Sequence, residues 1–201
     1  MALTLIDRHI LRAREHYHLR DGDRCYYLRE YTSGRGYQHS ETNQLISNFK
    51  IAVGPENEHR RRYKQRAIRQ VAAELSRCIN EAQLAQVTWV PIPPSKVKSD
   101  PLYDDRLLRT LKHVNGVQVA PLLEQRASTE PAHQSGDSRP TPEQLIANYK
   151  LIPPASPPQR LVIFDDVVTS GAHFRAASTV LAEAYPSARI EGIFIARRIM
   201  P

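Results

Sequence analysis

Apolar positions along this chain group into short continuous runs and into stripes with helical spacing. Buried strands of parallel sheets are continuously apolar, so the short runs predict strands at 25–29, 87–90, 117–123, 161–164 and 190–196. The stripes predict helices at 56–83, 103–114 and 172–184, one or two helical turns at 142–149, and a helix or an arm at 1–20.

Strands and helices alternate along most of the chain. This order predicts an α/β fold, with an open parallel sheet of about five strands and helices on both faces. The chain has 201 residues, which suits one domain with a small appendage, and 41% hydrophobic residues are enough to form a core.

Composition also indicates the cellular compartment of the protein. No apolar run approaches the ~20 residues of a membrane span. Residues 1–20 are interrupted by charges and lack the apolar region of a signal peptide. Cys25 and Cys78 are the only cysteines, which excludes a four-cysteine zinc site and argues against a disulfide scaffold. We therefore expect a cytoplasmic protein with no membrane contact.

Positive charge is concentrated in the first third of the chain. Residues 1–70 hold 14 Lys/Arg and 8 Asp/Glu, out of a total net charge of +7. The densest cluster is Arg60, Arg61, Arg62, Lys64, Arg66 and Arg69. It fits either a solvated helix start or a surface for polyphosphate, nucleic acid or an acidic protein.

The most informative stretch is the strand at 161–164 with the residues that follow it. Asp165 and Asp166 come directly after the strand, and the small polar turn from Thr169 to His173 opens a helix. Free N–H groups at a helix start suit a phosphate, and carboxylates accept hydrogen bonds from sugar hydroxyls. The pattern therefore favours a phosphorylated ribose. The alternative is an ordinary strand-to-helix turn with two solvated acids.

This stretch resembles the phosphoribosyl-pyrophosphate (PRPP) loop of type I phosphoribosyltransferases, and Phe164 to Ala172 match it. The resemblance implies that Asp165 and Asp166 hold the ribose hydroxyls. It also implies a 5′-phosphate site made by Val168, Thr169, Ser170, Gly171 and Ala172. His173 departs from the family, which usually has a small hydroxyl residue there, but its backbone N–H is retained.

Two further loops fall where the family holds pyrophosphate. After the strand at 87–90 comes a loop with Pro93, Pro94, Ser95, Lys96 and Lys98, whose lysines would neutralise the pyrophosphate. The alternative is a rigid proline turn with two exposed lysines. The second loop, from Arg126 to Arg139, corresponds to the family's flexible catalytic flap; the alternative is a plain surface loop.

Within the family the chain is most similar to the ComF-like branch. The similarity lies in Val90-Pro91-Ile92-Pro93, in Asn148-Tyr149 after the second loop, and in Asn48-Phe49-Lys50. ComF proteins usually carry an amino-terminal zinc ribbon, which this sequence lacks. Their pyrophosphate loop runs into Arg-Gly-Phe-Asn, where this chain has residues 100–106. We expect residues 1–50 to form an arm and an acceptor-binding hood, and residues 51–201 to form the phosphoribosyltransferase-like core.

The activity implied by the resemblance is that of a glycosyltransferase. A nitrogen acceptor would displace pyrophosphate from PRPP, with Mg²⁺ bridging pyrophosphate and ribose oxygens and with few direct protein ligands. The expected partners are PRPP and an acceptor, with a homodimer left open. The alternative is a non-catalytic module of the same fold that binds nucleic acid or a protein through the basic amino-terminal half. A third is an effector that acts on an unusual acceptor.

Overall fold

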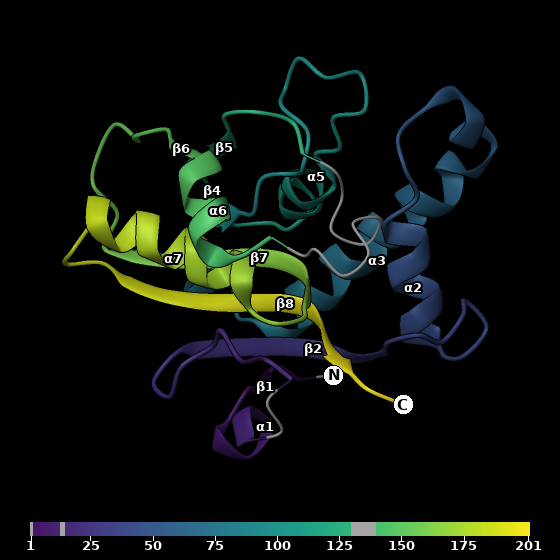
Figure 1. Ribbon diagram of the computed structural model, residues 1–201, viewed down its shortest axis with the longest axis horizontal. Helices are drawn as coiled ribbons and strands as arrows, with labels where there is room; N and C mark the ends of the chain where they lie inside the picture. Colours follow the sequence, from purple (N-terminus) through teal and green to yellow (C-terminus); the bar gives the residue numbers. More distant parts are fainter. Residues whose placement is uncertain (1, 13–14, 130–139) are drawn as a thin grey trace.

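A six-stranded sheet forms the centre of the computed structural model, which describes residues 2–12, 15–129 and 140–201 (Figure 1). Its strands are Thr4–Leu5 (β1), Arg24–Thr32 (β2), Thr88–Pro91 (β3), Gln118–Val119 (β4), Arg160–Val168 (β7) and Arg189–Ile199 (β8). They lie in the order β1-β2-β8-β7-β3-β4, and only β1 runs antiparallel to its neighbour. The predicted α/β class with a mostly parallel sheet is confirmed.

The strand β7 lies near the middle of this sheet, between β8 and β3. Its residues from Leu161 to Phe164 are all buried, although successive side chains point to opposite faces of a strand. Both faces of β7 must therefore be covered, which is why its sequence is a continuous apolar run.

The strand β2 comes from the stretch expected to form an arm and a hood. It pairs in parallel with β8 from Arg24, opposite Glu191, to Thr32, opposite Ile199. Residues 24–32 are thus part of the sheet, and the predicted strand at 25–29 is the middle of a longer one. β1 continues the sheet at its edge, with the short helix α1 (Arg8–Arg12) beside it at the bottom of Figure 1.

The helix predicted at 56–83 is divided into three pieces. They are a 3-10 helix, η1 (Pro55–Arg60), followed by α3 (Arg61–Cys78) and α4 (Glu81–Ala85). Ile79 is extended, and the Asn80 side chain accepts a hydrogen bond from the N–H of Ala82, so a new helix begins there. Apolar spacing alone does not show this break, because it continues across residue 79.

Two helices pack with α3. The first is α2 (Glu41–Phe49), a helix that the apolar pattern did not predict; Ser40 caps its start. The second is α5 (Arg106–Lys112), which is shorter than the predicted helix at 103–114. A buried ion pair between Arg29 of β2 and Glu74 of α3, with Nη2 to Oε1 at 2.6 Å, joins this group to the sheet.

The stretch predicted as one strand at 117–123 is also divided. β4 covers only Gln118–Val119, and β5 (Leu123–Gln125) pairs instead with β6 (Tyr149–Leu151) in a separate two-stranded sheet. Pro121 lies between the two pieces and has no N–H to donate to a ladder. The short helix α6 (Pro142–Asn148), close to the predicted turns at 142–149, packs on α7 (Ala172–Ala184).

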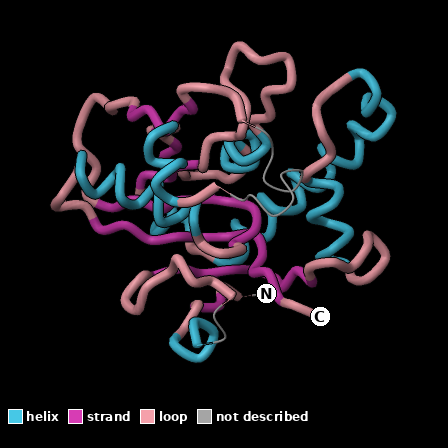
Figure 2. Tube along the Cα trace, viewed as in Figure 1, coloured by secondary structure: helices cyan, strands magenta, loops and turns pink. Residues whose placement is uncertain are grey.

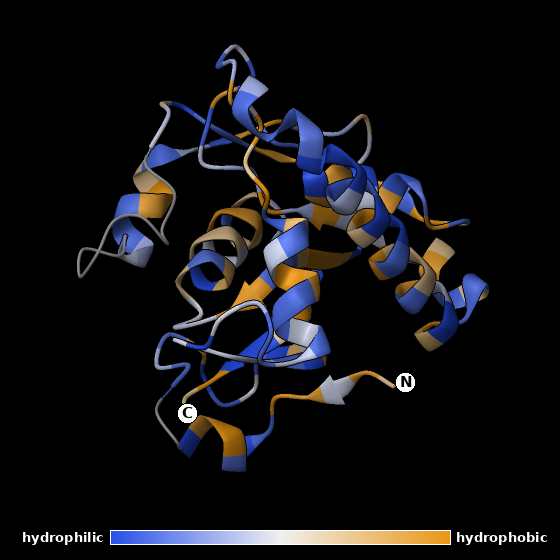
Figure 3. Ribbon diagram, turned by 90° about the vertical axis from the view of Figure 1, so that its right-hand side faces the viewer, coloured by the Kyte–Doolittle hydropathy of each residue, from blue (hydrophilic) through white to orange (hydrophobic). Residues whose placement is uncertain are grey.

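The strands run through the middle of the molecule with helices around them (Figure 2). Apolar strand segments lie between helices that carry much of the hydrophilic colour (Figure 3). Across the described residues, no helix combines the length and the apolar character needed to cross a membrane.

Gly192 provides a test of this packing. It is buried in β8, and an added Cβ would lie 2.9 Å from Cε2 of Phe174 and 3.0 Å from Sγ of Cys25. We predict that Gly192→Ala lowers the free energy of unfolding by about 1–3 kcal/mol, measured by urea denaturation. Gly36→Ala is the matched control, because nothing lies within 4 Å of its added Cβ, and equal stability of the two variants would contradict the packing.

Candidate functional site

Asp166, near the end of β7, is held by two cations. Its Oδ1 lies 2.8 Å from Nζ of Lys50, and its Oδ2 lies 2.7 Å from Nη2 of Arg106. The Asp166 side chain is only 7% exposed, so this pairing takes place largely away from water. Lys50 follows the last turn of α2 and Arg106 opens α5, so three elements meet at one carboxylate.

The ion pairs continue beyond Asp166. Nη1 of Arg106 lies 2.9 Å from Oδ2 of Asp104, and the same oxygen lies 2.6 Å from Nζ of Lys64. Lys64 also donates to the carbonyl of Ile51 at 2.6 Å. We call the residues Lys50, Asp166, Arg106, Asp104 and Lys64 the charge chain.

Sequence reasoning missed most of the charge chain. Lys50 was noted only as part of a resemblance, and Arg106 only as a departure from one. Lys64 was grouped with the surface arginines, yet it is 4% exposed and turned inward. Its spacing from Ile68 and Val71 on the apolar face of α3 is the signal that could have identified it as buried.

The surroundings shift the pKa values of Arg106 and Lys64 in opposite directions. Burial acts to lower the pKa of Arg106, but Asp166 and Asp104 outweigh it and hold that pKa above its ordinary value. Burial lowers the pKa of Lys64, and the pairing with Asp104 only partly offsets this. Arg106 is therefore fixed as a cation, which is the state that Asp166 requires.

The two acids of the pair have opposite character. Burial acts to raise the pKa of Asp166, but Lys50 and Arg106 outweigh it, so the pKa falls below its usual range. Burial and the neighbouring Asp166 charge raise the pKa of Asp165 to about 7. Oδ1 of Asp165 accepts the N–H of Asp166 at 2.7 Å. One acid is thus firmly ionised, and the other can take up a proton near neutral pH.

The turn that follows is braced from behind by residues 16–19. The His16 ring hydrogen-bonds with the carbonyl of Thr169, and the N–H of His18 donates to the carbonyl of Ser170 at 2.9 Å. Gly171 has φ +87°, and its added Cβ would lie 2.8 Å from the Leu19 side chain, so glycine is required here. This bracing orients the turn carbonyls toward residues 16–19.

The N–H groups of the turn are left for another partner. Within the described part of the chain, no hydrogen bond is made by the N–H groups of Thr169, Ser170 or Gly171. Ala172 and His173 begin α7, where the first N–H groups of a helix have no partner within the helix. Val168 ends β7 just before the turn. The predicted phosphate-binding residues are thus brought together beside the acid pair.

His173 uses its side chain for the fold. Its Nδ1 lies 3.0 Å from the hydroxyl of Tyr149, at the start of β6. Burial lowers the pKa of His173 to about 4, so the ring is neutral at physiological pH. The ring therefore connects α7 to the two-stranded sheet, and only the backbone N–H remains for a phosphate.

The predicted pyrophosphate loop begins next to the acid pair and then leads away from it. The N–H of Ile92 donates to the carbonyl of Phe164 at 2.9 Å, which places the start of the loop beside β7. Further along, the carbonyl of Ser95 accepts the N–H of Thr129 at 2.8 Å, so this loop is attached to the start of the predicted flap.

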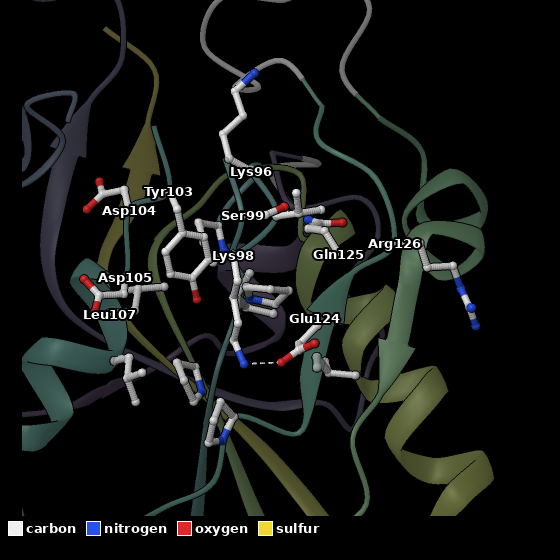
Figure 4. Close-up of a pocket in the computed structure, with 18 residues that line it drawn as sticks. Lys96, Lys98, Ser99, Tyr103, Asp104, Asp105, Leu107, Glu124, Gln125 and Arg126 are labelled. Carbon is white, nitrogen blue, oxygen red and sulfur yellow. Dashed lines mark hydrogen bonds and ion pairs between the residues drawn. The ribbon is translucent and has the colours of Figure 1, made fainter. Parts of the chain in front are cut away.

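Several predicted loop residues line a cavity of about 380 Å³ instead of facing the acid pair (Figure 4). They are Pro93, Pro94, Lys96, Lys98 and Arg126. Lys98 forms an ion pair with Glu124, while Lys96 and Arg126 extend away from that pair in the view. Asp165 and Asp166 do not line this cavity. Arg139, predicted for the flap, lies outside the described residues.

Among the described residues, no group of three or more His, Cys, Asp or Glu side chains is arranged to hold a metal ion. A scan of the chain against models of known protein families finds no match, and a search of curated proteins finds none.

The charge chain predicts a large difference between two arginines of α5. Arg106→Leu leaves buried Asp166 with one cation, and we expect it to lower the free energy of unfolding by about 3 kcal/mol in urea denaturation. Arg109 pairs closely with the more exposed Asp105, the N-cap residue of α5, and comes no nearer to Asp104 than 3.9 Å, so Arg109→Leu should cost at most about 1 kcal/mol. Similar losses in the two variants would contradict the role given to Arg106.

The raised pKa of Asp165 predicts a pH dependence of stability. In the unfolded chain Asp165 ionises near its ordinary pKa of 3.8, but in the fold only near about 7. Folding therefore favours the protonated acid, and this contribution to stability is lost as pH rises from about 4 to about 7. Asp165→Asn removes the loss, so its stability relative to wild type should be greater at pH 8 than at pH 5. Urea denaturation at both pH values measures this, and an unchanged difference would contradict it.

Proposed function

We propose that this chain is a type I phosphoribosyltransferase-like protein that binds PRPP and transfers its phosphoribosyl group to a nitrogen acceptor. The observation that carries the proposal is the end of β7, where paired carboxylates run directly into a braced turn with unused N–H groups at the start of α7. A phosphate and the hydroxyls of one ribose need these two kinds of partner side by side.

In this proposal the turn from Thr169 to His173 binds the 5′-phosphate through its N–H groups. Asp165 is the acid that has no cation paired to it among the described residues, so it is the better acceptor for the ribose hydroxyls. Asp166 is engaged by Lys50 and Arg106, yet a carboxylate has further lone pairs that can accept a hydroxyl. The charge chain then acts to hold Asp166 ionised and in place.

The leaving pyrophosphate needs positive charge near the acid pair. Lys50 is 31% exposed and lies at the acid pair, so it is well placed to meet this charge. Lys96 and Lys98 come from the predicted pyrophosphate loop, but Lys98 must first leave Glu124. In this proposal Mg²⁺ is held mainly by PRPP oxygens. When bound, Mg²⁺ would neutralise charge on the leaving group.

The reaction breaks the bond between the anomeric carbon and pyrophosphate and forms a bond to the acceptor nitrogen. The transition state is oxocarbenium-like, so stabilising the departing pyrophosphate contributes most. The proposal assigns the acceptor-binding hood to residues 1–50 and leaves a homodimer open.

Calorimetry with PRPP and Mg²⁺ tests the binding claim. We expect micromolar to sub-millimolar affinity, and a large loss in the double variant Asp165→Asn with Asp166→Asn, since each charge-assisted hydrogen bond is worth roughly 1.5–3 kcal/mol. A control with Asp21→Asn and Glu183→Gln removes two acidic charges from exposed positions and should bind normally. The absence of heat in folded wild type would refute the site.

A second measurement separates an enzyme from a binding module. Pyrophosphate release is followed with PRPP, Mg²⁺ and a panel of nitrogen heterocycles and amines. Release that depends on one acceptor supports transfer. Tight PRPP binding without release from any acceptor favours the non-catalytic alternative.

The surface arginines favour a second candidate, a nucleic-acid-binding module. Arg60, Arg61, Arg62, Arg66 and Arg69 are all exposed, and the Arg62 guanidinium lies 4.9 Å from the ring centre of exposed Tyr63. Cations beside an exposed ring suit phosphates and stacked bases.

Filter binding at two salt concentrations tests this candidate. If it holds, nucleic acid is retained with a steep salt dependence, and changing Arg60, Arg61 and Arg62 to Gln flattens that dependence while PRPP affinity is unchanged. The matched control changes Arg8, Arg12 and Arg20 to Gln, which are exposed on the amino-terminal segment. Equal effects of the two triple variants would indicate net charge alone.

A further inference from the structure

The cavity in Figure 4 is lined by residues of the predicted pyrophosphate loop but not by the acid pair. It lies beyond the carboxyl end of β3, on the side of β4, whereas the acid pair ends β7 on the other side of β3. Neither the acid pair nor any residue of the turn 169–173 lines it.

Most of the cavity wall is apolar. The loop after β3, the first turn of α5 and the stretch leading into β5 supply Pro93, Pro94, Leu107, Leu108, Pro121 and Leu123. The half-buried ring of Tyr103 adds an aromatic face, and in Figure 4 it lies beside the Lys98 side chain. A volume of about 380 Å³ is at the lower end of the range for small-molecule sites, so a compact ring system fits.

Four of the charged side chains that line the cavity are held in ion pairs. Lys98 and Glu124 form one ion pair within the view, while Lys96 and Arg126 extend away from it. On the remaining wall, Asp104 is neutralised by Lys64 and Arg106, and Asp105 by Arg109. A ligand with a hydrogen-bond acceptor and a donor side by side can use the Lys98–Glu124 pair without breaking it, whereas a pure hydrocarbon would leave it unused.

We propose that this cavity binds a neutral, planar heterocycle that carries a carbonyl next to an N–H group. The carbonyl accepts a hydrogen bond from Lys98, and the adjacent N–H donates to Glu124, so the ligand joins the ion pair without removing either charge. Its ring lies against the proline and leucine wall and the Tyr103 face. The proposal does not depend on PRPP binding.

Calorimetry with 2-pyridone, the smallest ring with this edge, tests the proposal on the wild-type protein. N-methyl-2-pyridone is the matched ligand, because it keeps the ring and the carbonyl but cannot donate to Glu124. We expect 2-pyridone to bind in the sub-millimolar to millimolar range and the N-methyl ring to bind roughly tenfold more weakly or worse. Equal affinities, or no binding of 2-pyridone at all, would overturn the proposal whether or not PRPP binds.

Variants then locate the ligand. Lys98→Met and Glu124→Met should each weaken 2-pyridone binding about tenfold, and Leu108→Trp should abolish it by filling the cavity. Lys112→Met is the control, because Lys112 is exposed on α5 and does not line the cavity, and it should bind normally. Circular dichroism checks that each variant is folded. Binding that survives all three changes would place the ligand elsewhere and refute this site.

Discussion

A buried carboxylate at the end of a central strand imposes the main constraint on this molecule. Asp166 is almost removed from water, and an unpaired charge there would be costly, so two cations must reach it. Lys50 reaches it from the end of α2 and Arg106 from the start of α5. The carboxylate thereby fixes where these helices begin and end relative to the sheet. Arg106 also pairs with Asp104, and Asp104 pairs with Lys64 of α3. The packing of three helices therefore depends on one acid.

The loop after β3 connects this constraint to the rest of the chain. It begins with a hydrogen bond from Ile92 to Phe164, one residue before the acid pair, and its later residues are bonded to the stretch at 128–129. Its first residues are therefore fixed by β7, while its last residues follow the segment between β5 and β6. A ligand at either end of the loop acts on the other only through this short run of backbone. The two proposed sites are neighbours in the fold that share residues of this loop.

Sequence reasoning was most successful where a feature is continuous in the chain. Local pattern predicts the strand at 161–164, the helix at 172–184 and the turn between them. Burial on both faces of a strand and the start of a helix each produce a recognisable sequence pattern. It was least successful where the partner is distant. Nothing near Asp166 indicates that Lys50 and Arg106 neutralise it, and Ile79 or Pro121 divides an element without changing the apolar pattern around it. Residues 24–32 were assigned to the arm and hood as part of residues 1–50, although eight of them pair with β8.

The two adjacent acids illustrate how position on a strand can separate chemical roles. Asp165 and Asp166 have the same side chain, but successive residues of a strand point to opposite faces. Asp166 meets two cations and stays ionised, while Asp165 meets mainly burial and the charge of its neighbour, so its pKa lies near neutrality. When one acid of the pair is ionised and the other is protonated, the pair can both accept and donate hydrogen bonds at physiological pH, as ribose hydroxyls require. Lys50 and Arg106 keep Asp166 ionised, and the Asp166 charge helps to raise the pKa of Asp165, so the protonation of Asp165 depends on two cations that pair with its neighbour.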